Sequence, residues 1–160
     1  MTYMPCATPP RTMGSLHLDA YDARCLDLRA RLGRLAGLEA MGREAALARE
    51  LPGLLRALRG HFGQALGQLG REAAAVEPDE ALPDPLRRAF DDLALRLAQG
   101  GPQALRGCAA DCLRLFRQGH ARVLEALPPA SMERLAKARR RVRRLALALL
   151  AVVGCALGLL

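Results

Sequence analysis

Apolar residues recur along this chain at spacings of three and four, a period that predicts amphipathic helices. The first stripe begins at Leu18 and continues through Tyr21, Cys25, Leu28, Leu32 and Leu35. Three further stripes extend from Leu55 to Val76, from Leu86 to Leu97 and from Leu105 to Leu127. Charged residues occupy the opposite faces of these segments. The pattern therefore predicts four main helices that pack their apolar stripes together.

Prolines and glycines set the expected ends of these helices. Pro52 suits the first turn of the second helix, where its missing N–H is harmless. The polar segment EPDEALPDP over residues 77–85 is expected to connect the second and third helices. Gly100 and Gly101 are expected to end the third helix, and Pro102 to begin an uninterrupted fourth one. A fifth helical stretch is expected to begin at Met132, capped by Ser131.

The last sixteen residues, LALALLAVVGCALGLL over 145–160, carry no polar side chain. A helix that is apolar on every face is typical of a membrane segment. It would span about 24 Å, short of the ~30 Å hydrocarbon core. Bilayer thinning and snorkelling of Arg143 and Arg144 could meet the difference. We expect a membrane tail; the alternative is a wholly buried core helix.

Composition supports helices over strands. The chain has 160 residues, enough for one core, and 51% of them are apolar. Only 3% are aromatic, and tryptophan and isoleucine are absent. Leucine and alanine must therefore build the core, as in helical proteins. The predicted fold is an all-α, up-down four-helix bundle with a C-terminal transmembrane or membrane-inserted helix. Its expected parts are a flexible arm over 1–14, a bundle over 15–144 and a membrane tail over 145–160.

Positive charge is concentrated beside this tail. Residues 131–160 contain seven basic side chains and one acidic one, and so carry most of the net charge of +8. We call five of these residues the basic collar: Arg139, Arg140, Arg141, Arg143 and Arg144. Each should be attracted to anionic lipid by about 1 kcal/mol, and basic flanks remain cytoplasmic. The partners expected from charge are thus anionic membrane lipids, with no nucleic acid, because the remainder of the chain is nearly neutral.

Residues capable of metal or catalytic chemistry are sparse. A carboxylate-bridged metal site in a bundle requires Glu-x-x-His pairs, yet Leu58 precedes His61 by three positions and Arg117 precedes His120. We expect these histidines to be half packed and half solvated. Cys108 and Cys112 could seat a soft metal or a redox pair, but packing as small apolar groups is favoured. No catalytic triad or phosphate loop is present. We expect no catalytic residues, no metal, no cofactor and no enzymatic activity.

The segment from about Leu26 to Pro129 resembles a small bacterial ferritin-like four-helix-bundle family of unknown function. The resemblance rests on HFGQALGQLGREAA, EPDEALPDPLRRAF, the Gly100-Gly101 break, ALRGCAADCLRLF and the LPP before the last helix. It implies a ferritin-like bundle. Relatives in that family usually have a Glu-rich start to the fourth long segment, whereas this chain has CAADC over residues 108–112. This departure weakens any inherited metal-binding role.

Together these features predict a non-enzymatic, tail-anchored helical-bundle interaction protein. It would lie on the cytoplasmic face of a bacterial inner membrane and bind an unknown protein partner. The alternatives are a ferritin-like metal or redox bundle in stress protection and a small membrane-disrupting protein. Metal content would separate the first alternative, and dye leakage from vesicles would test the second.

The tail also contains a GxxxG pattern, with Gly154 and Gly158 on one helical face. In lipid, such small residues permit the close backbone contact that drives helix association. We predict that Gly154→Leu combined with Gly158→Leu abolishes a homodimer, measured by cross-linking in membranes, while insertion is retained. An unchanged oligomeric state in the double variant would show that the GxxxG pattern does not mediate dimerisation.

Overall fold

A computed structural model describes residues 16–70, 77–133, 136–137 and 140 of the chain. The chain divides into two compact units, residues 1–125 and residues 126–160. The described part of the first unit contains essentially all of the helical bundle. In the second unit, a short helical segment begins at Pro129, so the helix starts two residues before the expected cap at Ser131.

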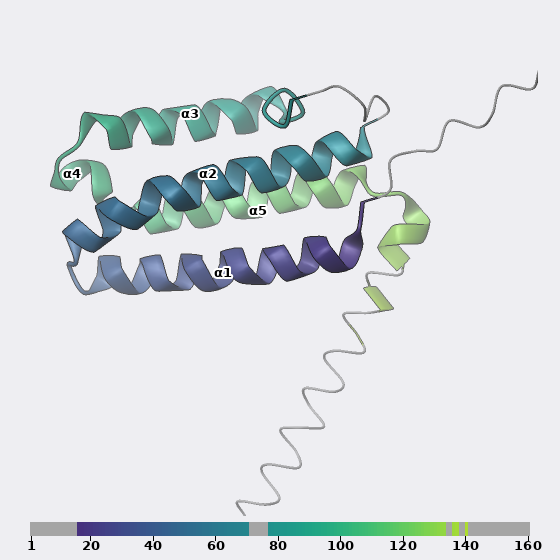
Figure 1. Cartoon of the computed structure of the whole chain (residues 1–160), viewed down its shortest axis with the longest axis horizontal. Helices are drawn as coiled ribbons and strands as arrows, with labels where there is room; N and C mark the ends of the chain where they lie inside the picture. The colour runs from purple at the N-terminus through teal and green to yellow at the C-terminus, as the bar shows by residue number, and fades with distance from the viewer. Residues whose placement is uncertain (1–15, 71–76, 134–135, 138–139, 141–160) are drawn as a thin grey trace, which may run out of the picture. The chain divides into compact units, whose positions relative to one another are not determined.

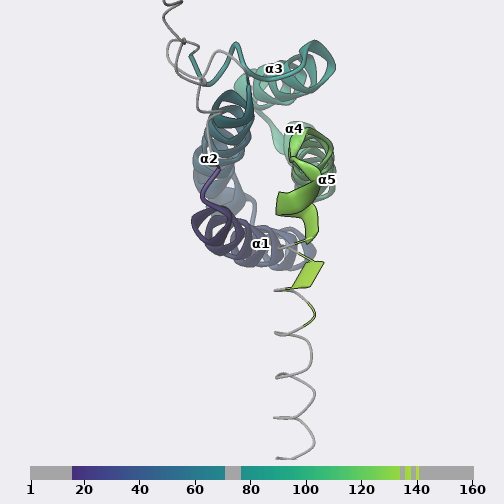
Figure 2. The ribbon, with the colours of Figure 1, turned by 90° about the vertical axis from the view of Figure 1, so that its right-hand side faces the viewer.

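Five helices make up the described bundle, and no strand occurs among the described residues. They are α1 (Leu18–Ala40), α2 (Glu44–Leu69), α3 (Asp84–Gln99), the single turn α4 (Pro102–Leu105) and α5 (Cys108–Ala126). The four long helices run in alternating directions along the chain (Figure 1). Viewed nearly along their axes, they surround a shared core (Figure 2). The all-α helical bundle expected from the sequence is confirmed.

Leucines from the predicted stripes fill this core. Every member of the first stripe from Tyr21 to Leu35 is buried, and Phe62 and Phe90 are fully enclosed. No charged or polar residue is among the buried ones in the described chain. The largest fully buried side chains are Phe62, Phe90, Leu28, Leu35, Leu51, Leu54, Leu58, Leu115, Val123, Cys108 and Cys112. Burial of this apolar surface is the main source of stability for helices of this length.

The second helix begins earlier than expected. Gly42, at φ +65°, ends α1, and the Arg43 N–H then donates to the Leu38 carbonyl. This tight turn lets α2 begin at Glu44, so Pro52 lies inside the helix and not in its first turn. Proline inside a helix costs about 3 kcal/mol. Burial of Leu47 and Leu51 in the preceding turns offsets that cost.

The fourth predicted helix is two helices. Gly100 and Gly101 end α3 as expected, both with positive φ. Gly107, at φ +72°, then separates α4 from α5. The Glu39 carboxylate of α1 accepts hydrogen bonds from the N–H groups of Gly107 (2.5 Å) and Ala109 (3.1 Å). An acidic side chain at this position satisfies free backbone donors and the dipole at the start of α5.

The acidic connection between α2 and α3 is held by an arginine. Arg59 of α2 forms ion pairs with Asp79 and with Asp91 of α3, the latter at 2.6 Å. The guanidinium holds the pKa of Asp79 below its usual range. Gly63 lies directly beneath the connection, since a Cβ there would come within 2.0 Å of the Pro78 carbonyl oxygen. Gly63 thus admits the connecting segment, because any side chain there would collide with it.

A second glycine, Gly119 of α5, makes room for an aromatic ring from α2. A Cβ on Gly119 would lie only 2.4 Å from the Phe62 ring. The same ring meets Phe116 edge to face, with centroids 5.7 Å apart. Phe62 therefore occupies space that is available only because residue 119 has no side chain.

No helix among the described residues is long and apolar enough to cross a membrane. The predicted tail over 145–160 and the arm over 1–14 lie outside those residues. The placement of these two parts stays a prediction.

We predict that Gly119→Ala destabilises the fold by roughly 1–3 kcal/mol, because the added methyl group overpacks the core against Phe62. Gly33→Ala is the matched control, since nothing lies within 4 Å of a Cβ at that position. The control should gain up to about 1 kcal/mol from helix propensity. Urea unfolding of the detergent-solubilised full chain measures both. Equal stability of the two variants would contradict this packing.

Candidate functional site

Four side chains from three helices meet near one end of the bundle. Tyr21 and Cys25 belong to α1, His61 to α2 and His120 to α5. The Tyr21 hydroxyl and His120 Nδ1 are 2.8 Å apart and form a hydrogen bond. Cys25 Sγ lies 3.4 Å from His61 Nε2 and 4.0 Å from His120 Nδ1. We call these four residues the histidine cluster.

Stacked rings support the cluster from within the core. Tyr21 lies nearly parallel to His61, with centroids 4.8 Å apart, and to His120 at 5.8 Å. Phe116 continues the stack beyond His120 at 6.0 Å. Tyr21 and Cys25 are buried, whereas both histidines are half-buried. The expectation that His61 and His120 lie at the boundary of the core is confirmed.

His61 is held in its neutral form. Burial, the positive charge of Arg24 and the neighbouring His120 lower its pKa to about 4. An activated cysteine requires a thiolate beside an imidazolium. Because the imidazolium is disfavoured here, His61 does not supply the positive partner that an activated Cys25 would need. This geometry supports a structural role for the pair over nucleophilic chemistry.

Two further cysteines, Cys108 and Cys112, are buried and protonated. Cys108 and Cys112 pack on the inner face of α5, and neither forms a disulfide. Burial raises the pKa of both thiols, that of Cys112 to about 12. The Cys108 thiol donates to the Ala104 carbonyl at 2.9 Å. The expectation that these residues pack as small apolar groups agrees with their burial.

Metal-binding geometry is absent from the part of the chain that the structure describes. No group of three or more His, Cys, Asp or Glu side chains there could hold a metal ion. Several carboxylates of this region are instead engaged by arginines, as in the ion pair between Asp111 and Arg96. Metal content of the whole protein stays a matter for measurement.

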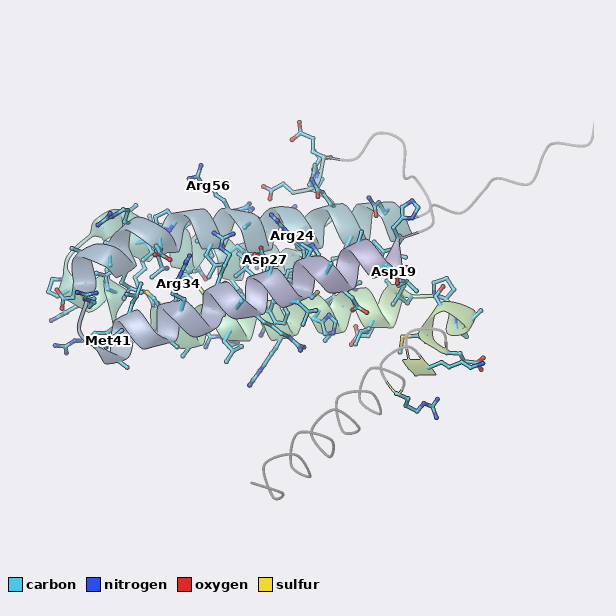
Figure 3. All side chains as sticks on the ribbon, turned by 60° about the horizontal axis from the view of Figure 1, so that its bottom comes forward. Asp19, Arg24, Asp27, Arg34, Met41 and Arg56 are labelled. Atoms are coloured by element: carbon cyan, nitrogen blue, oxygen red, sulfur yellow. The ribbon has the colours of Figure 1, made fainter. Side chains whose placement is uncertain are left out.

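A cavity of about 420 Å³ opens beside the histidine cluster, between α1 and α2. Tyr21, His61, Arg24 and Arg56 are among its lining residues. Figure 3 labels the two arginines, Arg24 on α1 and Arg56 on α2. Arg24 is 3.7 Å from Asp27 in an exposed ion pair. Such a pair contributes little to stability.

A larger apolar groove of about 760 Å³ lies between the second half of α1 and the first half of α5. Small residues on both helices leave the space open, and the buried Leu32 and Phe116 form part of its floor. Its lining residues are Arg29, Leu32, Gly33, Ala36, Glu39, Ala40, Ala109, Ala110, Leu113, Phe116 and Arg117. We call this the α1/α5 groove.

The residues predicted for membrane contact are mostly outside the described part. Arg140 alone among the basic collar is described; it is exposed, and its Nε donates to the Ala136 carbonyl at 3.3 Å. Arg139, Arg141, Arg143 and Arg144 lie outside, as do Gly154 and Gly158 of the tail. Their roles therefore stay predictions.

The sequence placed the four residues of the histidine cluster on apolar stripes or at the core boundary. It did not predict that these residues contact one another. Tyr21 and Cys25 stand four apart on the first stripe, and His61 precedes the buried Phe62. No spacing within one helix indicates that residues about 100 positions apart, such as Tyr21 and His120, form a hydrogen bond. The α1/α5 groove was also missed, although Gly33, Ala36 and Ala40 mark one face of α1 with small residues.

Comparison with known proteins finds no matching family model, curated protein or solved structure.

We predict that His61 makes stability depend on pH. The unfolded chain takes up a proton at this histidine near pH 6.5, but the folded chain does so only near pH 4. The contribution of His61 to the free energy of unfolding is therefore complete above pH 6.5 and falls as the pH drops from 6.5 toward 4. The slope should stay below about 1.4 kcal/mol per pH unit, because water screens a half-buried group.

Urea unfolding of the wild type and His61→Gln across this range measures the effect. The variant should lose part of the slope. His17→Gln, at an exposed histidine, is the control and should keep the wild-type slope. Identical slopes for the wild type and His61→Gln would refute the assignment.

Proposed function

We propose that this chain is a non-enzymatic, tail-anchored helical-bundle interaction protein. In this proposal the bundle faces the cytoplasm at a bacterial inner membrane and binds a protein partner. The observation that carries the binding role is the α1/α5 groove, an apolar concavity of about 760 Å³ on the outside of the bundle. Apolar concave surfaces with a few polar groups are where proteins bind other molecules.

The state of the buried side chains favours binding over catalysis. Within the histidine cluster, His61 is neutral at neutral pH, because its pKa is lowered to about 4. The Cys108 and Cys112 thiols are protonated at neutral pH, since burial raises their pKa. These three residues therefore supply neither a thiolate nor a histidine that titrates near neutral pH. The described core therefore serves mainly to hold the outer surfaces in place.

The membrane part of the proposal rests on the sequence. The basic collar ends where the apolar segment 145–160 begins, a boundary that a merely solvated charged face would not produce. Anionic lipids would attract the collar, and the apolar segment would enter the hydrocarbon layer. The ferritin-like, up-down form of the bundle is part of the same proposal; the alternating directions of its helices support it.

The proposal predicts that residues 145–160 are needed for membrane association. The full chain should sediment with membranes and resist carbonate extraction, whereas a chain ending at residue 144 should be recovered in the supernatant as a folded helical protein. Circular dichroism of the shortened chain distinguishes loss of an anchor from loss of the fold. Aggregation or unfolding of the shortened chain would make the segment a core element and defeat the proposal.

A separate experiment tests whether the positive charge of the basic collar contributes to membrane binding. Replacing all five collar arginines with glutamine removes about 1 kcal/mol of lipid attraction per residue. Binding to vesicles that contain anionic lipid should then weaken, and the uniform orientation of the chain, measured by protease protection, should be lost. Unchanged binding and orientation would mean that the apolar segment 145–160 alone determines both, and would contradict a role for the collar.

A further inference from the structure

The α1/α5 groove has a shape and charge pattern that specify its occupant. It follows α1 from Arg29 to Ala40, a length of about 16 Å or three helical turns. Gly33 and Ala36 of α1, with Ala110 of α5, present little side chain to fill it. An added Cβ on Gly33 would have nothing within 4 Å. A concave apolar surface of this length fits a single helix laid along it.

Charge at the two ends of the groove is unequal. Arg29 lies over the Phe116 ring, 5.4 Å from its centroid, and so stands at the same end as Arg117. Among the described residues, no carboxylate forms an ion pair with Arg29 or Arg117. Glu39 stands at the other end, where the N–H groups of Gly107 and Ala109 already engage it. One end of the groove therefore offers two cations to an incoming anion.

We propose that the α1/α5 groove binds an amphipathic helix of a partner protein, with acidic residues at the end that meets Arg29 and Arg117. The apolar face of that helix would pack on Leu113, which is 37% exposed, and on the exposed Gly33 and Ala36. Its carboxylates would pair with the two arginines. This inference rests on the proposed function, since it names the chemistry of the partner.

Two other occupants fit less well. The chain's own segment 145–160 is apolar, but the basic collar next to it would bring like charges toward Arg29 and Arg117. A second copy that presented the same groove would place one concave surface against another. An acidic helix satisfies both the shape and the charge.

The test uses the full chain in lipid nanodiscs and a pair of fluorescent peptides. Each peptide has about 14 residues, enough for the three-turn groove, with leucines on one helical face. One carries glutamates at one end, and its twin carries lysines at the same positions. Fluorescence anisotropy should show the glutamate peptide binding about tenfold more tightly than its twin, because both arginines attract one and repel the other.

Two variants locate the binding. Gly33→Leu should block the groove and lower the affinity for the glutamate peptide at least tenfold. Gly60→Leu is the matched control: it makes the same change on α2, again with nothing within 4 Å of a Cβ, and should bind as the wild type does.

The double variant Arg29→Gln with Arg117→Gln should remove the preference for the glutamate peptide over the lysine peptide. Arg49→Gln with Arg88→Gln, which removes the same charge from α2 and α3, should preserve it.

Each contrary result overturns the inference. Equal affinity for the two peptides would assign the groove to an uncharged occupant, such as the chain's own apolar segment. Retained binding in Gly33→Leu, or no binding of either peptide, would remove the groove as the docking site. A smaller particle mass for Gly33→Leu in light scattering would make the groove a contact between copies. Membrane fractionation decides the anchored location independently, so these failures leave that part of the proposed function standing.

Discussion

The contact between the Phe62 ring and Gly119 determines much of the described bundle. The Phe62 ring of α2 can lie on the backbone of α5 only because position 119 has no side chain, since a Cβ there would collide with the ring. His61 precedes Phe62 and His120 follows Gly119, so the same contact carries both histidines toward α1. Tyr21 and Cys25 can then reach them. The histidine cluster is thus a consequence of one aromatic ring packed against one glycine.

The cluster in turn shows how this core tolerates polar atoms. The buried Tyr21 hydroxyl pairs with His120 and the buried Cys25 thiol with His61, which avoids the cost of leaving these two groups unsatisfied. The neutral form of His61 suits this arrangement, because a buried imidazolium would need a nearby carboxylate. Burial lowers the pKa of His61, and the nearby Arg24 reinforces this effect. The site is built for packing and hydrogen bonding within the bundle.

Much of the helical framework was predictable from periodicity, since the stripe from Tyr21 to Leu35 is buried and the α3 stop at Gly100 is confirmed. The prediction that Pro52 lies in the first turn of its helix was wrong, because burial of Leu47 and Leu51 extends α2 by two turns before it. The uninterrupted helix from Pro102 was wrong because Gly107 adopts a positive φ. Both outcomes depend on tertiary packing or backbone conformation, which spacing does not encode.

The two candidate sites differ in why sequence reasoning missed them. The histidine cluster requires knowledge of which helices are neighbours, so no local signal could reveal it. The α1/α5 groove has a local signal, the run of small residues on α1 that includes Gly33 and Ala36. A small residue on a helix can either allow another segment to pack closely or leave the surface open. Gly63 is covered by Pro78, whereas Gly33 faces open space. Only three-dimensional packing separates a glycine that admits another part of the chain from one that leaves a surface open.

An open helical glycine is unfavourable for the isolated bundle. At Gly33, glycine lowers helix stability by about 1 kcal/mol relative to alanine, and no atom approaches closely enough to compensate. The cost at Gly63 and Gly119 is offset by packing of Pro78 and Phe62, so these two glycines are explained by the fold itself. The same explanation fails at Gly33, where the space above the residue belongs to the α1/α5 groove. A helix docked in that groove would supply contacts that Gly33 lacks in the isolated bundle, which connects this open glycine with the proposed binding role.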